Sequence, residues 1–322
     1  MPIEQDPDLE LLVKVAWLYY FRNLTQQDIA EKLNLSRPKV GRLLKKALDE
    51  GIVEIRLSPS VQSYDLTIEN ELESRFGLRE ALVVNSAEDQ STLYDNLGMA
   101  CARYLDRILG PNFILGIGLG TTVRAILPHI SPHKSSNGTI VTLSGGFSQP
   151  GHDTSNYNAS WPLANLLEAK LEQLYCPLVA QNKAARDAIL SDRSLSGQLK
   201  RATESQIALI SIGYVHLDMS LRRLEFCERE DVERLKEAGA VGEILVNFFD
   251  IYGNQIKTDL GDRMIGLSID ELKKIPTTIA ISGGIEKATA ILGALRTGCL
   301  NVLITDQKTA QMVLDLDDEI RK

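Results

Sequence analysis

Short apolar runs alternate with longer amphipathic stretches from residue 80 onward, and this alternation constrains the fold more than any other feature of the sequence. Short apolar runs are typical of strands that are buried on both faces of a sheet. The runs are Ala81–Val84, Phe113–Gly118, Gly138–Leu143, Ile207–Ile212, Thr277–Ser282 and Asn301–Ile304. The amphipathic stretches include Leu93–Ile108, Leu163–Leu174, Asp231–Ala238 and Lys287–Thr297. This order predicts a doubly wound α/β domain with a mainly parallel sheet covered on both faces.

Three helices are predicted ahead of this domain, and the second and third have capping signals. Apolar residues recur at helical spacing over residues 9–21. Thr25, with Asp28 three residues later, has the pattern of a capping box at the start of a second helix. Ser36 caps a third helix, and Pro38 falls in its first turn, where a missing N–H costs nothing.

The segment after the third helix predicts a wing and a domain boundary. Gly51 ends the helix, and Ile52–Leu57 alternates like a strand. We therefore expect a winged helix-turn-helix unit over residues 1–57. Ser58-Pro59-Ser60 is the candidate boundary, and residues 58–322 are expected to form the α/β domain.

The third predicted helix carries several cations and no acid over residues 36–46. In a helix-turn-helix this helix lies in the major groove and its N-terminal residues meet base edges. Arginine can bond guanine with two donors, whereas lysines further along and the start of the preceding helix suit phosphates. The alternative is a solvated basic face, and the order of cap, turn, second cap and cationic helix favours DNA. The candidate DNA-binding residues are Thr25, Gln26, Ser36, Arg37, Lys39, Arg42, Lys45 and Lys46.

The remaining composition points to a cytoplasmic protein without a metal or cofactor. The net charge is −8, but the acidic excess lies outside the basic helix, where it would help to orient the molecule on DNA. No apolar stretch approaches the roughly 18 residues of a membrane span, and the acidic N-terminus lacks the features of a secretory signal. The four cysteines are scattered without metal-ligand spacing, so we expect buried thiols.

Three glycine clusters follow predicted strands, over residues 116–122, 144–146 and 282–287. The carboxyl ends of parallel strands form the ligand crevice of such a sheet, and glycine lets backbone N–H groups approach an anion there. Thr121 and Thr122 add hydroxyl groups and Lys287 adds a cation, so a phosphate group fits this set of donors. The alternative is that tight strand-to-helix turns need glycine for packing alone. The first cluster is not a dinucleotide fingerprint, because Thr122 stands at the third glycine position.

Polar residues elsewhere could bind sugar hydroxyls. Gln181 and Asn182 follow an apolar run, and Asp250 ends another beside a turn. For Asp250 a turn-forming role and a hydroxyl-binding role remain equally open. The candidate effector-binding residues are Gly118, Gly120, Thr121, Thr122, Ser144, Gly145, Gly146, Gln181, Asn182, Asp250, Gly283, Gly284 and Lys287.

Segments along almost the whole chain resemble the SorC family of bacterial sugar-operon regulators. The matching segments are residues 16–20, 24–30, 35–44, 118–122, 143–146, 240–244, 248–250, 283–287 and 305–310. The resemblance implies an effector domain similar to sugar-phosphate isomerases and glucosamine-phosphate deaminases, in a homodimer or homotetramer. It also implies that the glycine-threonine loop, the Ser-Gly-Gly region, Asp250 and the Gly-Gly-x-x-Lys segment border the effector. Some relatives carry an imine-forming lysine where this chain has Ser144, so we expect reversible rather than covalent binding.

The sequence therefore predicts a DNA-binding transcriptional regulator of a carbohydrate-utilisation operon, controlled by a phosphorylated sugar. The alternative is an isomerase or deaminase fused to a DNA-binding domain. Such an enzyme needs a positioned acid/base beside a carbonyl. The predicted loops offer only the isolated Asp250 and Glu286, so we expect no catalysis.

Overall fold

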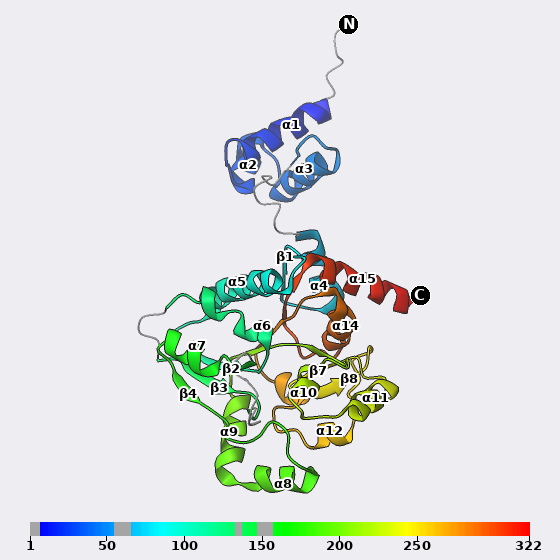
Figure 1. Cartoon of the computed structure of the whole chain (residues 1–322). Helices are drawn as coiled ribbons and strands as arrows, with labels where there is room; N and C mark the ends of the chain where they lie inside the picture. The colour runs from blue at the N-terminus through cyan, green and yellow to red at the C-terminus, as the bar shows by residue number, and fades with distance from the viewer. Residues whose placement is uncertain (1–6, 55–65, 133–136, 147–156) are drawn as a thin grey trace. The chain divides into compact units, whose positions relative to one another are not determined.

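The computed structural model describes residues 7–54, 66–132, 137–146 and 157–322 (Figure 1). The chain divides into two compact units, Met1–Gln62 and Ser63–Lys322, called unit 1 and unit 2 below. The predicted boundary between residues 57 and 58 lies outside the described residues. None of the described helices is long and apolar enough to cross a bilayer.

Unit 1 contains the three predicted helices, α1 (Pro7–Tyr20), α2 (Gln26–Leu33) and α3 (Arg37–Asp49). Both sequence caps are confirmed: Thr25 and Asp28 form a capping box on α2, and Ser36 caps α3. Asn34 ends α2 in the left-handed conformation, with φ of 54°. The strand predicted over residues 52–57 is absent from Ile52–Glu54, where Ile52 and Val53 form a bend, and positions 55–57 lie outside the described residues.

Unit 2 is built on a seven-stranded sheet in which every neighbouring pair is parallel. All six predicted strands are present, and the strand order is β1-β10-β9-β5-β2-β3-β4. The strands are β1 (Glu80–Val84), β2 (Ile114–Ile117), β3 (Thr139–Thr142), β4 (Lys170–Glu172), β5 (Ile207–Ile210), β9 (Thr277–Ile281) and β10 (Val302–Asp306). From β2 the chain continues to β3 and β4 on one side of the sheet, and from β5 it continues to β9 and β10 on the other side. The strand order therefore reverses between β2 and β5.

Helices cover both faces of this sheet, as predicted. Alternating residues of a strand face opposite sides: Ile279 and Ile281 pack with α5, whereas Ala280 packs with α14 and α15. The long elements are α4 (Leu66–Phe76), α5 (Gln90–Ile108), α8 (Lys183–Ser191), α9 (Arg193–Thr203), α11 (Arg229–Glu237), α14 (Ala288–Arg296) and α15 (Gln307–Arg321). The shorter ones are α6 (Thr121–Arg124), η2 (Leu127–His129), α7 (Ser160–Leu166), α10 (Ser220–Arg223), α12 (Asp259–Asp262), α13 (Ile269–Leu272) and η4 (Ile285–Lys287).

Two parts of unit 2 differ from the sequence prediction. The helix predicted over Leu163–Leu174 ends early, because Glu168 adopts a left-handed φ of 49° and Lys170–Glu172 joins the sheet edge as β4. A small antiparallel sheet, not predicted, consists of β6 (Gly213–Tyr214), β7 (Gly242–Ile244) and β8 (Asn247–Phe249). Strands of two or three residues carry too little alternation to be detected in a sequence.

Candidate functional site

The basic face of α3 is exposed along its whole length. Val40 and Leu44 are buried in the core of unit 1, so the opposite side of the helix faces the solvent. The cations on that side are all exposed: Arg37, Lys39, Arg42, Lys45 and Lys46. Lys46 pairs with Glu50 at 3.6 Å, and both side chains of this pair are exposed.

Thr25 and Ser36, which the sequence predicts to contact DNA, use their hydroxyl groups to cap their own helices. The Thr25 hydroxyl donates to Asp28 Oδ2 at 2.7 Å, and the Ser36 hydroxyl accepts from the Lys39 N–H at 3.4 Å. Gln26 is partly exposed and lies beside Gly41 of α3. The start of α2 and the first turns of α3 therefore form one continuous surface.

A cleft opens in unit 2 at the carboxyl ends of β2 and β5, where the strand order reverses. This is the position at which open α/β sheets bind their ligands. We call it the switch-point cleft. Its inner hollow has a volume of about 90 Å³, and an adjoining hollow of about 160 Å³ shares Thr121, Glu243 and Lys287 with it. Polar residues of the inner hollow are Thr121, Thr122, Ser144, Tyr157, Ser211, Ser220, Glu243 and Lys287.

Lys287 and Glu243 bring opposite charges to this cleft. Both side chains are half-buried. Burial lowers the pKa of the Lys287 ammonium, although Glu286 and Glu243 act to raise it. Burial likewise raises the pKa of the Glu243 carboxyl, against the effects of the Val246 N–H and Lys287. The cleft thus disfavours the charged forms of both side chains, and a bound ligand of opposite charge could stabilise either one.

Glu243 also holds an unusual turn. Its Oε2 accepts from the Val246 N–H at 2.6 Å, while its Oε1 lies so close over Gly213 that any Cβ there would be 2.0 Å away. Leu245 and Val246, between β7 and β8, have φ of 47° and 62°. Such conformations are rare for branched residues and cost on the order of 1–3 kcal/mol each. Both side chains line the cleft, so the strain is stored in its wall.

The backbone donors of two predicted glycine clusters are already bonded within the protein. The Gly145 N–H donates to Ile265 O and the Gly146 N–H to Cys176 O, each at 2.9 Å. The Gly284 N–H donates to Asp306 Oδ2 at 2.9 Å. A Cβ on Gly145 would lie 2.4 Å from the Pro177 carbonyl. For these positions the packing alternative fits the geometry.

The two threonines after β2 have different surroundings. The Thr122 hydroxyl donates to Ile281 O at 2.8 Å, and the residue is 1% exposed. Thr121 is partly exposed and lines both hollows. Gly118 is buried against Leu245, and Gly120 lies beside Ser211 at the start of α6.

Asp306 fixes the loop that presents Lys287. Its Oδ2 accepts from the Gly284 N–H and from the Thr309 hydroxyl at 2.5 Å, and its Oδ1 accepts from the Ser86 hydroxyl at 2.6 Å. Burial acts to raise the pKa of the Asp306 carboxyl, but these hydrogen bonds outweigh it and hold the pKa below its ordinary value.

Three predicted effector residues lie away from the cleft. Asp250 Oδ1 accepts from the N–H groups of Tyr252 and Asn254 at 2.9 and 2.8 Å, which favours the turn-forming alternative. Asn182 caps α8 by accepting from the Ala185 N–H, and Gln181 beside it is exposed. None of the three lines the switch-point cleft.

Sequence reasoning missed several residues of the cleft. Glu243 lies in the segment 240–244 that resembles the SorC family, so a signal for it was present. Ser211 lies near the end of the strand predicted over 207–212 and Gly213 directly follows it, so the rule that ligands bind at carboxyl strand ends would have found them. Arg223 at the mouth of the cleft belongs to the short helix α10 and carries no such signal.

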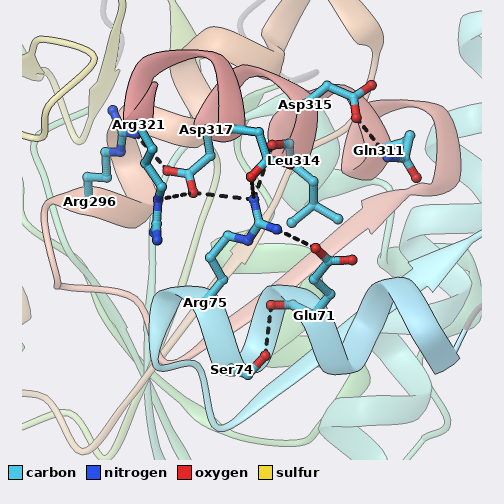
Figure 2. A network of polar contacts seen from close by, with 10 residues as sticks. Glu71, Ser74, Arg75, Arg296, Gln311, Leu314, Asp315, Asp317 and Arg321 are labelled. Atoms are coloured by element: carbon cyan, nitrogen blue, oxygen red, sulfur yellow. Dashed lines mark hydrogen bonds and ion pairs between the residues drawn. The ribbon is translucent and has the colours of Figure 1, made fainter.

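A second polar centre lies at the other end of α14 (Figure 2). The buried Asp317 carboxylate of α15 pairs with Arg296, the last residue of α14, at 2.6 Å and with Arg321 at 2.6 Å. Arg75 of α4 lies 3.5 Å from the same carboxylate and also pairs with Glu71 and Asp318. We call these residues the Asp317 cluster; it ties α4, α14 and α15 together.

Comparison with known families matches both units. Residues 61–315 match the family described as "Putative sugar-binding domain", and residues 22–54 match the family described as "Winged helix-turn-helix DNA-binding". The first match covers most of the chain.

Individual relatives resemble the chain along its full length. It is 32% identical to the deoxyribonucleoside regulator of Bacillus subtilis over 307 residues, which are 95% of this chain and 97% of that protein. It is 30% identical to the transcriptional regulator LsrR of Enterobacter sp. over 311 residues, or 95% and 93% of the two chains. The crystal structure of the full-length sorbitol operon regulator SorC from Klebsiella pneumoniae superposes with a TM-score of 0.72 at 28% identity, covering 96% of this chain and 100% of that one.

Proposed function

Because this chain belongs to the SorC family of sugar-operon transcriptional regulators, we propose that it binds operator DNA through α3 and responds to a phosphorylated sugar bound reversibly in the switch-point cleft. The two activities divide between residues 1–57 and 58–322. The chain is a regulator rather than an enzyme, in keeping with the relatives, which are named as transcriptional regulators.

The observation that carries the sensor proposal is the convergence of Lys287 and the start of α6 on one cleft. A sugar phosphate brings about two negative charges. Helix starts favour negative charge, and a lysine ammonium adds a charge-assisted hydrogen bond. Thr121 supplies a hydroxyl group at the same point. The phosphate is therefore proposed to bind between Thr121 and Lys287.

The sugar part is proposed to lie against Glu243 and Ser211. The inner hollow is smaller than the roughly 300–1,000 Å³ typical of ligand pockets, so the ligand must extend into the adjoining hollow. Ser144 in the wall replaces the lysine that forms an imine in some relatives, which favours reversible binding. Gln181, Asn182 and Asp250 lie outside this proposed site.

The DNA proposal depends on the cations of α3. Arg37 and Arg42, in the first half of the helix, are proposed to read base edges, whereas Lys45 and Lys46 lie further along it and are proposed to contact phosphates. One helix-turn-helix contacts few base pairs, so a homodimer or homotetramer on paired half-sites is proposed. Analytical ultracentrifugation should show a dimer or larger; a monomer both free and on DNA would contradict the proposed assembly.

A thermal-shift screen with phosphorylated sugars tests the sensor. A specific ligand at 100 times its Kd adds about 2.7 kcal/mol to stability. Fluorescence anisotropy on DNA selected from a random pool then shows whether the stabilising sugar changes DNA affinity. The proposed function fails if no phosphorylated sugar stabilises the chain, or if a stabilising sugar leaves DNA binding unchanged.

A further inference from the structure

Helix α1 is apolar on two sides. Leu12, Val15 and Leu18 are buried within unit 1. On the other side, apolar residues recur every four positions and remain exposed: Leu9 by 47%, Val13 by 47%, Trp17 by 49% and Phe21 by 77%. Phe21 continues the helix by donating its N–H to Trp17 O at 3.0 Å. We call these four residues the α1 stripe.

The α1 stripe is too apolar for a surface that stays in water. The four side chains expose roughly 400 Å², which lies in the range of the largest patches on monomeric proteins, and such patches commonly bind a partner. The basic face of α3 is a separate surface, so the stripe can be covered while DNA is bound.

We propose that the α1 stripe pairs with the same stripe of a second copy, with the two helices antiparallel. This inference rests on the proposed homo-oligomer. Charges select the direction. Asp8 and Glu10 lie at the N-terminal end of the stripe. Arg22 lies at its C-terminal end, where its guanidinium is 5.7 Å from the centre of the Trp17 ring. An antiparallel pair places the acids of each copy beside the Arg22 of the other and aligns the helix dipoles favourably. A parallel pair would oppose Glu10 to Glu10 and Lys14 to Lys14.

The spacing fixes the register of this pair. The stripe is centred on residue 15, so a two-fold axis there places Val13 opposite Trp17 of the second copy and Leu9 opposite Phe21 of the second copy. In one helix, residues 9 and 21 are about 18 Å apart, given a rise of about 1.5 Å per residue. Only pairing between two copies can therefore bring these positions together.

The size of the patch indicates what the pairing can do. Two stripes would bury roughly 800 Å², less than the roughly 1,200–2,000 Å² of a stable interface. The pairing is therefore an accessory contact, which holds two DNA-binding units in a defined orientation while other parts of the chain maintain the oligomer.

Thiol cross-linking of the full chain tests the inference. We compare the double variant Leu9→Cys/Phe21→Cys with Phe21→Cys alone, using a short bifunctional maleimide and denaturing gels. The unsubstituted chain reports any background from the four native cysteines, of which Cys176 is partly exposed. The expected result is a covalent dimer in the double variant and at least roughly tenfold less in the single variant, because residues 21 and 21 of two antiparallel copies are about 18 Å apart.

A third variant separates specific pairing from chance collision. Adding Trp17→Glu to the double-cysteine chain introduces a charge at the centre of the stripe and should reduce cross-linking several-fold. Equal cross-linking by Phe21→Cys alone would overturn the antiparallel pairing. Absence of cross-linking in a chain that ultracentrifugation shows to be a dimer would overturn the role of the stripe while the proposed oligomer stands. A monomeric chain would instead remove the oligomer on which this inference rests.

Discussion

The Asp317 cluster offers the sharpest test of how unit 2 is held together. Asp317→Asn keeps the shape of the side chain but removes its charge. The Asp317 side chain is 0% exposed, and Arg75 and Arg296 beside it are 17% and 16% exposed. Both guanidinium groups would then be left half-desolvated without their shared carboxylate (Figure 2).

The expected loss follows from what each arginine retains. Removing one partner of a buried ion pair costs about 3–5 kcal/mol. Arg75 keeps Glu71 and Asp318, and Arg296 keeps the Ile251 carbonyl at 2.9 Å. Arg321 is 58% exposed and its pair adds little. We therefore expect Asp317→Asn to lower the free energy of unfolding of unit 2 by about 2–4 kcal/mol.

Thermal unfolding followed by circular dichroism measures this loss. For a unit of this size the loss corresponds to a decrease in Tm of roughly 4–16 °C. Asp315→Asn is the matched control, since Asp315 lies on the same helix, is exposed, and accepts a hydrogen bond from the side-chain amide of Gln311 at 2.9 Å (Figure 2). A double-mutant cycle with Arg296→Gln should be non-additive. A Tm for Asp317→Asn within about 2 °C of the control would refute the reasoning.

Three further predictions concern the two binding surfaces and their support. Arg37→Ala or Arg42→Ala should each cost about 1–3 kcal/mol in DNA binding and relax base preference, whereas Lys45→Ala should weaken all sequences alike and flatten the salt dependence; anisotropy across a salt series checks both. Lys287→Ala should weaken sugar-phosphate binding by about 1.5–3 kcal/mol in calorimetry, with exposed Lys274→Ala as control. Because the pKa of Lys287 is lowered, the affinity of the unsubstituted chain should fall with rising pH earlier than an ordinary lysine would allow; a pH-independent affinity that Lys287→Ala leaves unchanged would rule out this phosphate site. Asp306→Asn should lower the free energy of unfolding at neutral pH. This difference in stability from the unsubstituted chain should disappear as the pH falls below about 4 and through the lowered pKa of Asp306, because the carboxylate contributes only while it is charged. A difference in stability that persists in acid would show that the charge of Asp306 is unimportant.

Features that depend on residues close together in the chain could be predicted from the sequence. The two caps at Thr25 and Ser36 located α2 and α3, because each is set by a single side chain bonding its own helix start. The strands of the parallel sheet were found because both of their faces are buried, which leaves an apolar run. Glu168 shows the limit: nothing in its residue type announces the left-handed backbone that ends α7.

The candidate site was only partly predictable, because the sequence does not show which donors the fold itself uses. Glycine clusters after strands correctly indicated the carboxyl edge of the sheet. Whether an N–H there is available depends on partners far away in the sequence, such as Ile265 for Gly145 and Asp306 for Gly284. The sequence left the role of Asp250 open in the same way. Its hydrogen bonds from the Tyr252 and Asn254 N–H groups favour a turn-forming role.

Helix α14 explains how the cation at position 287, the proposed phosphate ligand, is firmly placed. Lys287 directly precedes the helix and Arg296 ends it, so the two polar centres are separated by nine residues, or about 13 Å. At the first end, Asp306 bonds Gly284 and fixes the loop. At the second end, Asp317 bonds Arg296 and connects the helix to α4, the first described element of unit 2. A half-buried lysine loses solvation and remains charged only while groups of opposite charge lie beside it. The position of Lys287 relative to these groups must therefore be fixed, and the contacts at both ends of α14 fix it.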